Sequence, residues 1–340
     1  MMTVVENQNA ESLCMKRRRM AEITHRIVET NGIKMHIAEQ GKGPLVILCH
    51  GFPELWYSWR HQLGALADAG FHAVVPDQRG YGRTDRPEPV EDYNILKLTG
   101  DITGLVHVLG EERAIIVGHD WGAPVAWYCT LLRPDIFKAL VLMSVPYRSG
   151  SWESIRPTEA MRRMAGKQEF YQLYFQEVGK AERELEKDVR KSMLTFLYSA
   201  SGDPPQEKRW RFLFDKSQRF IDTGFLPDAL PTWLTEHDLD VFSQEFGRTG
   251  FRGGLNWYRN IDRNWELTSF LNGAAIHQPA LFVAGEFDGV IVMSRRAFDT
   301  LETSIPNLKS KVLIPGAGHW VQQERPREVN KLLIEFLTSL

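Results

Sequence analysis

The segment Gly118-His119-Asp120-Trp121-Gly122 has the residue types and spacing for nucleophilic chemistry. It follows the apolar, β-branched run 114–117 and precedes a helix-compatible segment, residues 124–132. A strand, a sharp turn with flanking glycines and a helix form a nucleophile elbow, which exposes one side chain above a sheet. That position usually carries serine, whereas here it carries Asp120. An aspartate that only caps the following helix would fit the same local pattern.

An aspartate nucleophile predicts a particular class of reaction. A carboxylate is ionised at neutral pH and can attack a saturated, electrophilic carbon to form an alkyl ester. Attack on an ester or amide would instead give an anhydride with little driving force. Asp120 therefore indicates substrates with a strained or good leaving group on saturated carbon, and epoxides and alkyl halides are the main candidates.

Two later segments place polar residues directly after apolar runs. Residues 280–284 lead into Gly285-Glu286-Phe287-Asp288, and residues 311–314 lead into Gly316-Ala317-Gly318-His319-Trp320. The carboxyl ends of parallel strands meet at one edge of a sheet, where ligands bind in α/β folds. We expect both polar groups at the edge that carries the elbow.

These segments supply the partners of a catalytic triad. The chain order Asp120, Asp288, His319 is the nucleophile, acid, histidine order of an α/β-hydrolase. Glu286 competes for the role of the acid, and we favour Asp288 because it lies further beyond the strand end. His119 competes for the role of the base, but its position beside the nucleophile favours a structural ring.

Backbone amides near the elbow are candidates for an oxyanion hole. The apolar run 45–49 ends in His50-Gly51-Phe52-Pro53, a glycine turn at the same predicted edge. The amide of Phe52 and the amide of Trp121 could both point at a developing oxyanion. A tight turn with a packed aromatic side chain would explain the first motif equally well.

The alternation of strands and helices predicts an α/β fold with a mostly parallel central sheet and helices on both faces. The alternation runs over residues 23–145, stops in a charged, aromatic and helical insertion at 146–264, and resumes at 265–340. The insertion, read as a helical lid or cap, includes predicted helices at 159–164 and 180–196. The predicted strands are 23–30, 33–38, 45–49, 71–75, 114–117, 138–145, 280–284 and 311–314, and the predicted core helices are 57–69, 93–109, 124–132, 294–301 and 325–337.

Composition excludes several classes of function. The 340 residues carry a formal net charge of −2, and the Lys and Arg residues are scattered, which argues against nucleic acid as a partner. No apolar stretch reaches the ~18 residues of a membrane span. The three cysteines lack metal or redox spacing, which favours a reduced, cytoplasmic setting. Residues 1–22, with a basic cluster at 16–19 and no apolar signal region, are expected to form a disordered, solvated extension.

The motifs around Phe52, Asp120, Asp288 and His319 together resemble the soluble epoxide hydrolases of the α/β-hydrolase fold. The resemblance covers nearly the whole chain from Ile23 onward. It implies that an ester on Asp120 is hydrolysed by a water molecule that His319 and Asp288 activate, without a metal or organic cofactor. The substrates would be a small epoxide and water.

The same resemblance implies two tyrosines in the cap that hold the epoxide oxygen. The matching positions are Tyr171 and Tyr258, although Tyr174 lies one helical turn from Tyr171 and competes with it. An alkoxide leaves poorly unless an O–H donor lies close to the ring oxygen. The aromatic residues near these positions are expected to line an apolar substrate cavity, namely Phe52, Trp121 and Trp257.

Two alternatives remain open from the sequence. A haloalkane dehalogenase uses the same aspartate nucleophile, and the Trp121 indole could hold a halide, although Phe52 stands where a polar second halide ligand is expected. A binding module with a vestigial triad is the other alternative, against which the presence of all five candidate groups argues. The sequence leaves both a monomer and a homodimer open.

Overall fold

The structure is a computed structural model that describes residues 22–149 and 155–340. The expected extension at 1–22 lies, except for its last residue, outside the described residues. An eight-stranded sheet forms the centre of the fold, in the order β1-β2-β4-β3-β5-β6-β9-β10. The strands are β1 Thr24–Thr30, β2 Ile33–Gln40, β3 Leu45–Cys49, β4 His72–Pro76, β5 Ala114–His119, β6 Phe137–Met143, β9 Ala280–Gly285 and β10 Leu308–Ile314.

Most of this sheet is parallel, as the sequence predicts. Strand β2 pairs antiparallel with both β1 and β4, and all the other neighbours pair in parallel. The central strands β3 and β5 are apolar runs that are buried along their whole length. Strands covered on both faces have this composition, because neither face of the sheet meets water.

Two hydrophobic clusters cover the two faces of the sheet. In β3, Ile47 and Cys49 belong to one cluster, whereas Val46 and Leu48 belong to the other, because successive side chains point to opposite faces. The first cluster includes helices α3 (Ile95–Val108) and α4 (Gly122–Leu132). The second includes α2 (Arg60–Asp68) and α16 (Pro326–Thr338). The predicted α/β architecture, with helices on both faces, is confirmed.

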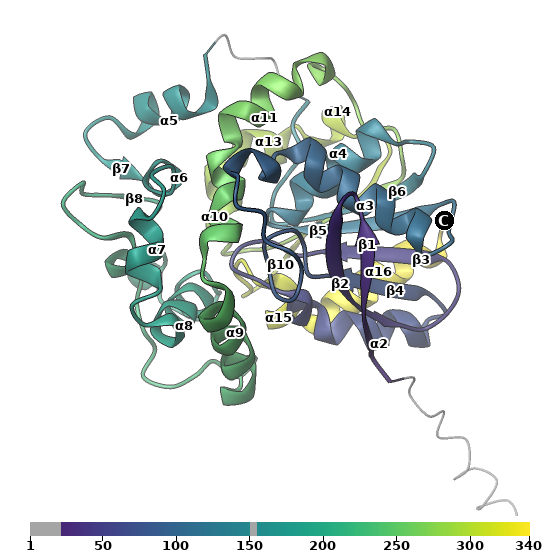
Figure 1. Cartoon of the computed structure of the whole chain (residues 1–340), viewed down its shortest axis with the longest axis horizontal. Helices are drawn as coiled ribbons and strands as arrows, with labels where there is room; N and C mark the ends of the chain where they lie inside the picture. The colour runs from purple at the N-terminus through teal and green to yellow at the C-terminus, as the bar shows by residue number, and fades with distance from the viewer. Residues whose placement is uncertain (1–21, 150–154) are drawn as a thin grey trace, which may run out of the picture.

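The insertion between β6 and β9 is mainly helical and lies beside the sheet layers, over one end of the core (Figure 1). We call residues 155–264 the cap; the boundaries of the insertion at 146 and 264 stay predictions. Its helices are α5 Pro157–Ala165, α6 Tyr171–Tyr174, α7 Lys180–Leu185, α8 Val189–Ser199, α9 Glu236–Thr249, α10 Arg252–Arg259 and α11 Ile261–Leu267. The remaining elements of the chain are η1 Trp56–Trp59, η2 Val90–Tyr93, η3 Gln206–Lys208, η4 Phe220–Thr223, η5 Ser269–Leu271, α12 Gly289–Met293, α13 Arg295–Asp299, α14 Leu301–Ser304 and α15 Val321–Glu324.

Three local expectations differ from the structure. The helix predicted at 180–196 is two helices, since the Asp188 side chain accepts a hydrogen bond from the Lys191 amide (3.0 Å) and caps a new helix. The helix predicted at 294–301 is likewise divided into α13 and α14. The cap also contains a short ribbon of β7 (Glu169–Phe170) with β8 (Leu213–Phe214), whose two-residue strands carry no periodic signal.

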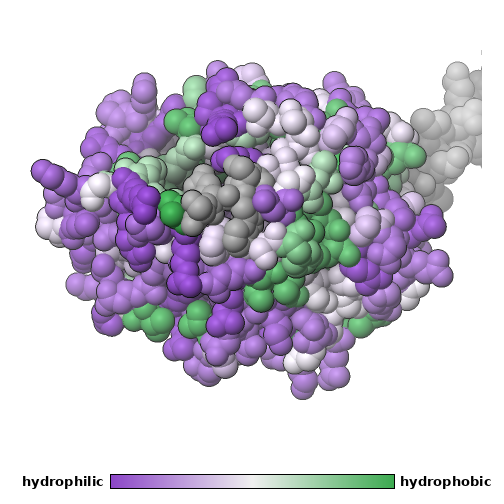
Figure 2. Space-filling view, turned by 90° about the horizontal axis from the view of Figure 1, so that it is seen from above, coloured by the Kyte–Doolittle hydropathy of each residue, from purple (hydrophilic) through white to green (hydrophobic). Residues whose placement is uncertain are grey.

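One face of the molecule is largely hydrophilic. The face in Figure 2 carries mainly polar side chains, interrupted by a larger apolar area and several smaller ones. No described helix has both the length and the apolar composition that crossing a membrane requires.

Candidate active site

Asp120 occupies the turn between β5 and α4, at the carboxyl edge of the parallel strands. Its φ of 49° lies in the left-handed region, which is strained for a residue other than glycine. A Cβ on Gly122 would lie 2.1 Å from the carbonyl oxygen of Cys49, so only glycine lets α4 approach β3 this closely. The turn has the geometry predicted for a nucleophile elbow.

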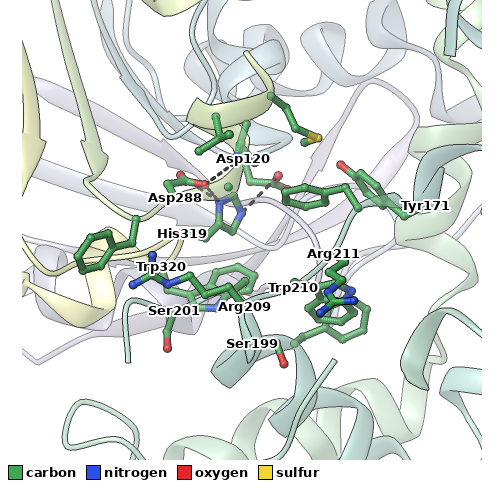
Figure 3. A pocket seen from close by; sticks show the side chains of 18 of the residues that line it. Asp120, Tyr171, Ser199, Ser201, Arg209, Trp210, Arg211, Asp288, His319 and Trp320 are labelled. Atoms are coloured by element: carbon green, nitrogen blue, oxygen red, sulfur yellow. Dashed lines mark hydrogen bonds and ion pairs between the residues drawn. The ribbon is translucent and has the colours of Figure 1, made fainter. Parts of the chain in front are cut away.

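The structure brings His319 and Asp288 to Asp120, as Figure 3 shows. The Nε2 atom of His319 lies 3.5 Å from Oδ2 of Asp120. On the other side of the ring, Nδ1 lies 3.2 Å and 3.3 Å from the two carboxylate oxygens of Asp288. Asp288 is fully buried, and its Oδ1 also accepts a hydrogen bond from the Val290 amide at the start of α12 (2.9 Å). The imidazole therefore lies between two carboxylates.

The charges in this cluster shift the pKa values of His319 and Asp288. Burial lowers the pKa of His319, but the negative charges of Asp288 and Asp120 outweigh it and raise this pKa well above the ordinary value. Burial raises the pKa of Asp288, but the His319 ring and hydrogen bonds outweigh it and lower the pKa overall. With Asp120 ionised, these charges favour the imidazolium form of the ring.

Glu286, the alternative acid, lies away from this group. Its side chain is exposed, and its Oε2 accepts a hydrogen bond from the Gly316 amide at 3.1 Å. The structure thus places Asp288, not Glu286, against the His319 ring.

The backbone around Asp120 offers hydrogen-bond donors. The Phe52 amide donates to Oδ1 of Asp120 at 2.8 Å. Trp121 directly follows Asp120 and precedes the first residue of α4. The Phe52 amide thus contacts the Asp120 carboxylate directly, whereas Trp121 is placed beside Asp120 by the chain.

Two cavities meet at Asp120. One of about 400 Å³ and one of about 800 Å³ are both lined by Asp120, Tyr171 and Tyr258. Phe52 lines the first cavity and Trp121 lines the second. These aromatic walls fit an apolar ligand.

The two cap tyrosines are neutral hydrogen-bond donors in this setting. Burial, reinforced by the charge of Asp120, raises the pKa of Tyr258 and of Tyr171 far above the ordinary value. Their ring centroids lie 6.0 Å apart. The Tyr171 hydroxyl oxygen accepts a hydrogen bond from Gln172 at 2.8 Å, which leaves its proton free to donate.

The competing tyrosine, Tyr174, points elsewhere. Its hydroxyl donates to Glu184 Oε2 at 2.7 Å, and Tyr174 lines neither cavity. Of the two tyrosines one helical turn apart, the structure places Tyr171 at the cavities.

Trp257 does not have the expected position. It lines neither cavity, it is almost fully buried, and its indole N–H donates to the carbonyl oxygen of Arg79 at 3.1 Å. Consecutive residues of a helix point about 100° apart, so α10 directs Tyr258 to the cavities and turns Trp257 toward the core loop. The expectation that Trp257 lines the substrate cavity is corrected accordingly.

Sequence reasoning missed a second buried pair next to the triad. The Glu54 carboxylate lies 2.7 Å from Nδ1 of His119, and Nε2 of His119 lies 2.8 Å from the carbonyl oxygen of His319. Glu54 also accepts hydrogen bonds from the Gly51 amide and from Gln322. Burial raises the pKa of Glu54, but His119, the charge of His50 and the Gly51 amide outweigh it and lower the pKa to about 2. The expected structural role of His119 agrees with these contacts.

One signal for this pair was present in the sequence. Glu54 follows the glycine turn at His50-Gly51-Phe52-Pro53 directly, and His119 precedes the nucleophile directly. In the residues that the structure describes, no group of three or more His, Cys, Asp or Glu side chains could hold a metal ion.

The fold and the elbow together define a class of protein. Residues 44–326 match the family model described as alpha/beta hydrolase fold. The strand order, the Asp120 elbow after β5 and the histidine after the last strand agree with that match.

Several similar proteins show to which family within this fold class the chain belongs. The chain is 48% identical over 323 residues to epoxide hydrolase A of Mycobacterium tuberculosis, covering 94% of this chain and 99% of that protein. Epoxide hydrolase 2 of Siraitia grosvenorii is 40% identical over 94% of this chain and 99% of its own length. A solved epoxide hydrolase from an endophytic Streptomyces superposes with a TM-score of 0.89 at 47% identity, covering 93% of this chain and 95% of that one. The chain belongs to the epoxide hydrolases of the α/β-hydrolase fold family.

Proposed function

We propose that this protein hydrolyses epoxides to vicinal diols through a covalent ester on Asp120. In the first step, a carboxylate oxygen of Asp120 attacks an epoxide carbon, and the bond from that carbon to the ring oxygen breaks. Tyr171 and Tyr258 donate hydrogen bonds to the leaving oxygen, and one of them transfers its proton. The product of this step is a hydroxyalkyl ester.

The second step cleaves the ester and returns the enzyme. Ester formation removes the negative charge of Asp120, one of the two charges that raise the pKa of His319. The imidazolium of His319 first gives its proton to the tyrosinate left by the first step and becomes neutral. His319, held by Asp288, then accepts a proton from water, and the hydroxide attacks the ester carbonyl carbon. The Phe52 and Trp121 amides stabilise the tetrahedral oxyanion. As this adduct collapses, the bond from the carbonyl carbon to the diol oxygen breaks, and that oxygen takes the proton of the Asp120 carboxyl. The diol leaves, with Asp120 again a carboxylate and His319 again an imidazolium.

One observation carries this proposal: the two cavities meet where Asp120 faces Tyr171 and Tyr258, with His319 3.5 Å from the Asp120 carboxylate. Phenol donors facing a carboxylate suit a leaving group that needs a proton. A halide needs none, so this arrangement favours an epoxide over an alkyl halide.

A paired assay tests the choice of substrate. Purified protein is incubated with an aryl epoxide, with diol as the readout, and with a short dihaloalkane, with halide release as the readout. We expect diol and no halide. Halide without diol would assign the site to dehalogenation, and unchanged recovery of both compounds would favour a binding module.

A single turnover in ¹⁸O-labelled water tests the covalent step. Because water attacks the ester carbonyl, the label should enter the Asp120 carboxylate, and the diol of the first turnover should carry oxygen from the enzyme. Mass spectrometry of the peptide that contains Asp120 measures this. Label found only in the diol would contradict the ester, and Asp120→Ala should show neither turnover nor labelling.

A further inference from the structure

Glu324, the last residue of α15, is a buried carboxylate for which the proposed chemistry has no use. It is 5% exposed, and it accepts three backbone hydrogen bonds. Its Oε2 accepts from the Gly318 amide at 2.9 Å, and its Oε1 accepts from the Trp320 amide at 2.9 Å. These two amides flank His319 on both sides, so Glu324 holds the backbone of the proposed base.

The third hydrogen bond reaches the cap. Oε2 of Glu324 also accepts from the Gly202 amide at 2.8 Å. The His319 amide itself donates to the carbonyl oxygen of Ala200 at 2.8 Å. The His319 loop and the end of α8 are therefore joined by four backbone amides, three of which share one carboxylate.

The two chain segments touch backbone to backbone at this point. A Cβ on Gly318 would lie 2.2 Å from the carbonyl carbon of Ser201, and a Cβ on Gly202 would lie 2.4 Å from the carbonyl oxygen of Gly316. Only glycine at both positions allows this approach. The carboxylate of Glu324 thus lies at a point where the backbones of cap and core are in direct contact.

The joined segments also form the wall of the smaller cavity. Ser199, Ala200 and Ser201 of the cap line it together with His319 and Trp320 of the core, and Figure 3 shows Ser199 and Ser201 there. A shift of Glu324 would therefore change both the position of the proposed base and the shape of the substrate cavity.

Several charges face Glu324 or the segments that it holds. Burial and the negative charge of Asp203 raise the pKa of Glu324 to about 7, although its three amide donors lower it. Four titratable or charged residues lie around it. Asp203 lies in the loop after α8, His319 in the loop after β10, and Arg325 directly before α16. Arg60, at the start of α2, donates a hydrogen bond to Gln323, the neighbour of Glu324.

We propose that Glu324 is a positioning residue for ester hydrolysis, which fixes His319 against the cap through the amides of Gly318, Trp320 and Gly202. This inference rests on the proposed two-step function. A protonated carboxyl has one oxygen that bears hydrogen, and that oxygen accepts poorly from an N–H group. Protonation of Glu324 therefore loosens the His319 loop and slows the hydrolytic step, while ester formation, which does not need His319, continues.

Rapid-quench kinetics on an aryl epoxide test this separation of the two steps, with the ester measured by mass spectrometry. In Glu324→Gln the amide nitrogen cannot accept from one of the amides that Glu324 holds. We expect ester formation within about twofold of wild type and ester decay about 10- to 100-fold slower at pH 8, as for a small misplacement of a catalytic group. Glu39→Gln is the matched control, because it removes a mostly buried carboxylate from its partners Arg26 and His72 in a part of the sheet that lines neither cavity.

Asp203→Asn provides a second, milder test in a protein that keeps Glu324. Removing the charge of Asp203 lowers the pKa of Glu324, so the pH at which ester decay is half-maximal should move to lower pH, with no change at pH 8. No shift in this variant, or ester decay at the wild-type rate in Glu324→Gln, would overturn the inference. An equal slowing of both steps would also overturn it, since it would indicate general loosening. Absence of any ester in wild type would instead overturn the proposed function.

Discussion

The ionisation of His319 depends on the charge of Asp120, 3.5 Å away. While both carboxylates are charged, they favour the imidazolium form of His319, which cannot act as a base. An ester on Asp120 removes one of these charges, and the pKa of His319 falls. In the proposed reaction, the base thus becomes available only after the intermediate that requires it has formed.

The first prediction concerns His319→Gln. Because His319 acts only in the second step, this variant should still form the ester and then retain it. Diol formation should fall by about 10²- to 10⁴-fold, the usual contribution of a general base. Mass spectrometry of the intact protein should show the mass of one epoxide added, and this addition should disappear in the double variant with Asp120→Ala. An unmodified His319→Gln protein would contradict the assigned order of steps.

The second prediction separates the tyrosines. Tyr171→Phe and Tyr258→Phe each remove one O–H donor facing Asp120, so each should slow ester formation, and the double variant should lose about 10²- to 10⁴-fold. Tyr174→Phe is a matched control, because the hydroxyl of Tyr174 bonds to Glu184 and lines neither cavity. Stopped-flow measurement of the first turnover gives the rate. A loss in Tyr174→Phe as large as in Tyr171→Phe would indicate a change in cap packing rather than a lost donor.

At the scale of elements, the sequence predicted the positions that follow parallel strands. Asp120, Asp288 and His319 each come directly after a buried apolar run, and parallel strands bring such positions to one edge whatever lies between them. The positions of the strands along the chain, the mostly parallel sheet and the elbow could therefore be predicted from periodicity and glycine placement, whereas the order of the strands in the sheet was not predicted. The tyrosines could not, because nothing local in the cap sequence separates Tyr171 from Tyr174; their assignment needed the resemblance.

Other features depend on tertiary contacts that the local sequence does not determine. The orientation of Trp257 follows from how α10 packs on the core, where its indole N–H meets the carbonyl of Arg79. The Glu54–His119 pair joins residues 65 positions apart. The break before α8 did have a local cause, the capping side chain of Asp188, but the apolar spacing on both sides obscured it.

The third prediction concerns the connection between the tyrosine-bearing helices. Arg259, next to Tyr258 in α10, donates to the carbonyl oxygen of Phe175 (3.1 Å) and pairs with Glu182 (2.8 Å), both beyond Tyr171 in the chain. The pair is almost fully buried. Arg259→Met leaves an unpaired carboxylate and should destabilise the protein by about 3–5 kcal/mol. Urea unfolding measures this against Arg252→Met, which removes an exposed arginine of the same helix. Equal losses in the two variants would show that the buried pair adds nothing beyond a surface charge.

At the scale of the whole molecule, three parts of the fold contribute to the site. The sheet supplies the elbow and the strand ends, the cap supplies the tyrosines, and buried carboxylates join the loops between them. Glu54 lies beneath the elbow and bonds to the loop of Gly51, to His119 after β5 and to Gln322 of α15. Its charge is therefore coupled to the folding of the core as a whole.

The fourth prediction follows from the pKa of about 2 for Glu54, against an ordinary value of 4.5. A carboxyl whose pKa is lower in the folded state stabilises the fold fully above its unfolded pKa, and this contribution is lost as the pH falls through the folded pKa. The difference in unfolding free energy between wild type and Glu54→Gln should thus include about 3 kcal/mol at pH 7 that disappears between about pH 4.5 and pH 2. Denaturant unfolding over this range measures it. Glu335→Gln, in an exposed pair with Lys331 on α16, should differ from wild type by less than about 1 kcal/mol. A difference for Glu54→Gln that is constant from pH 7 to pH 2 would show that the pKa of this carboxyl is not lowered by folding.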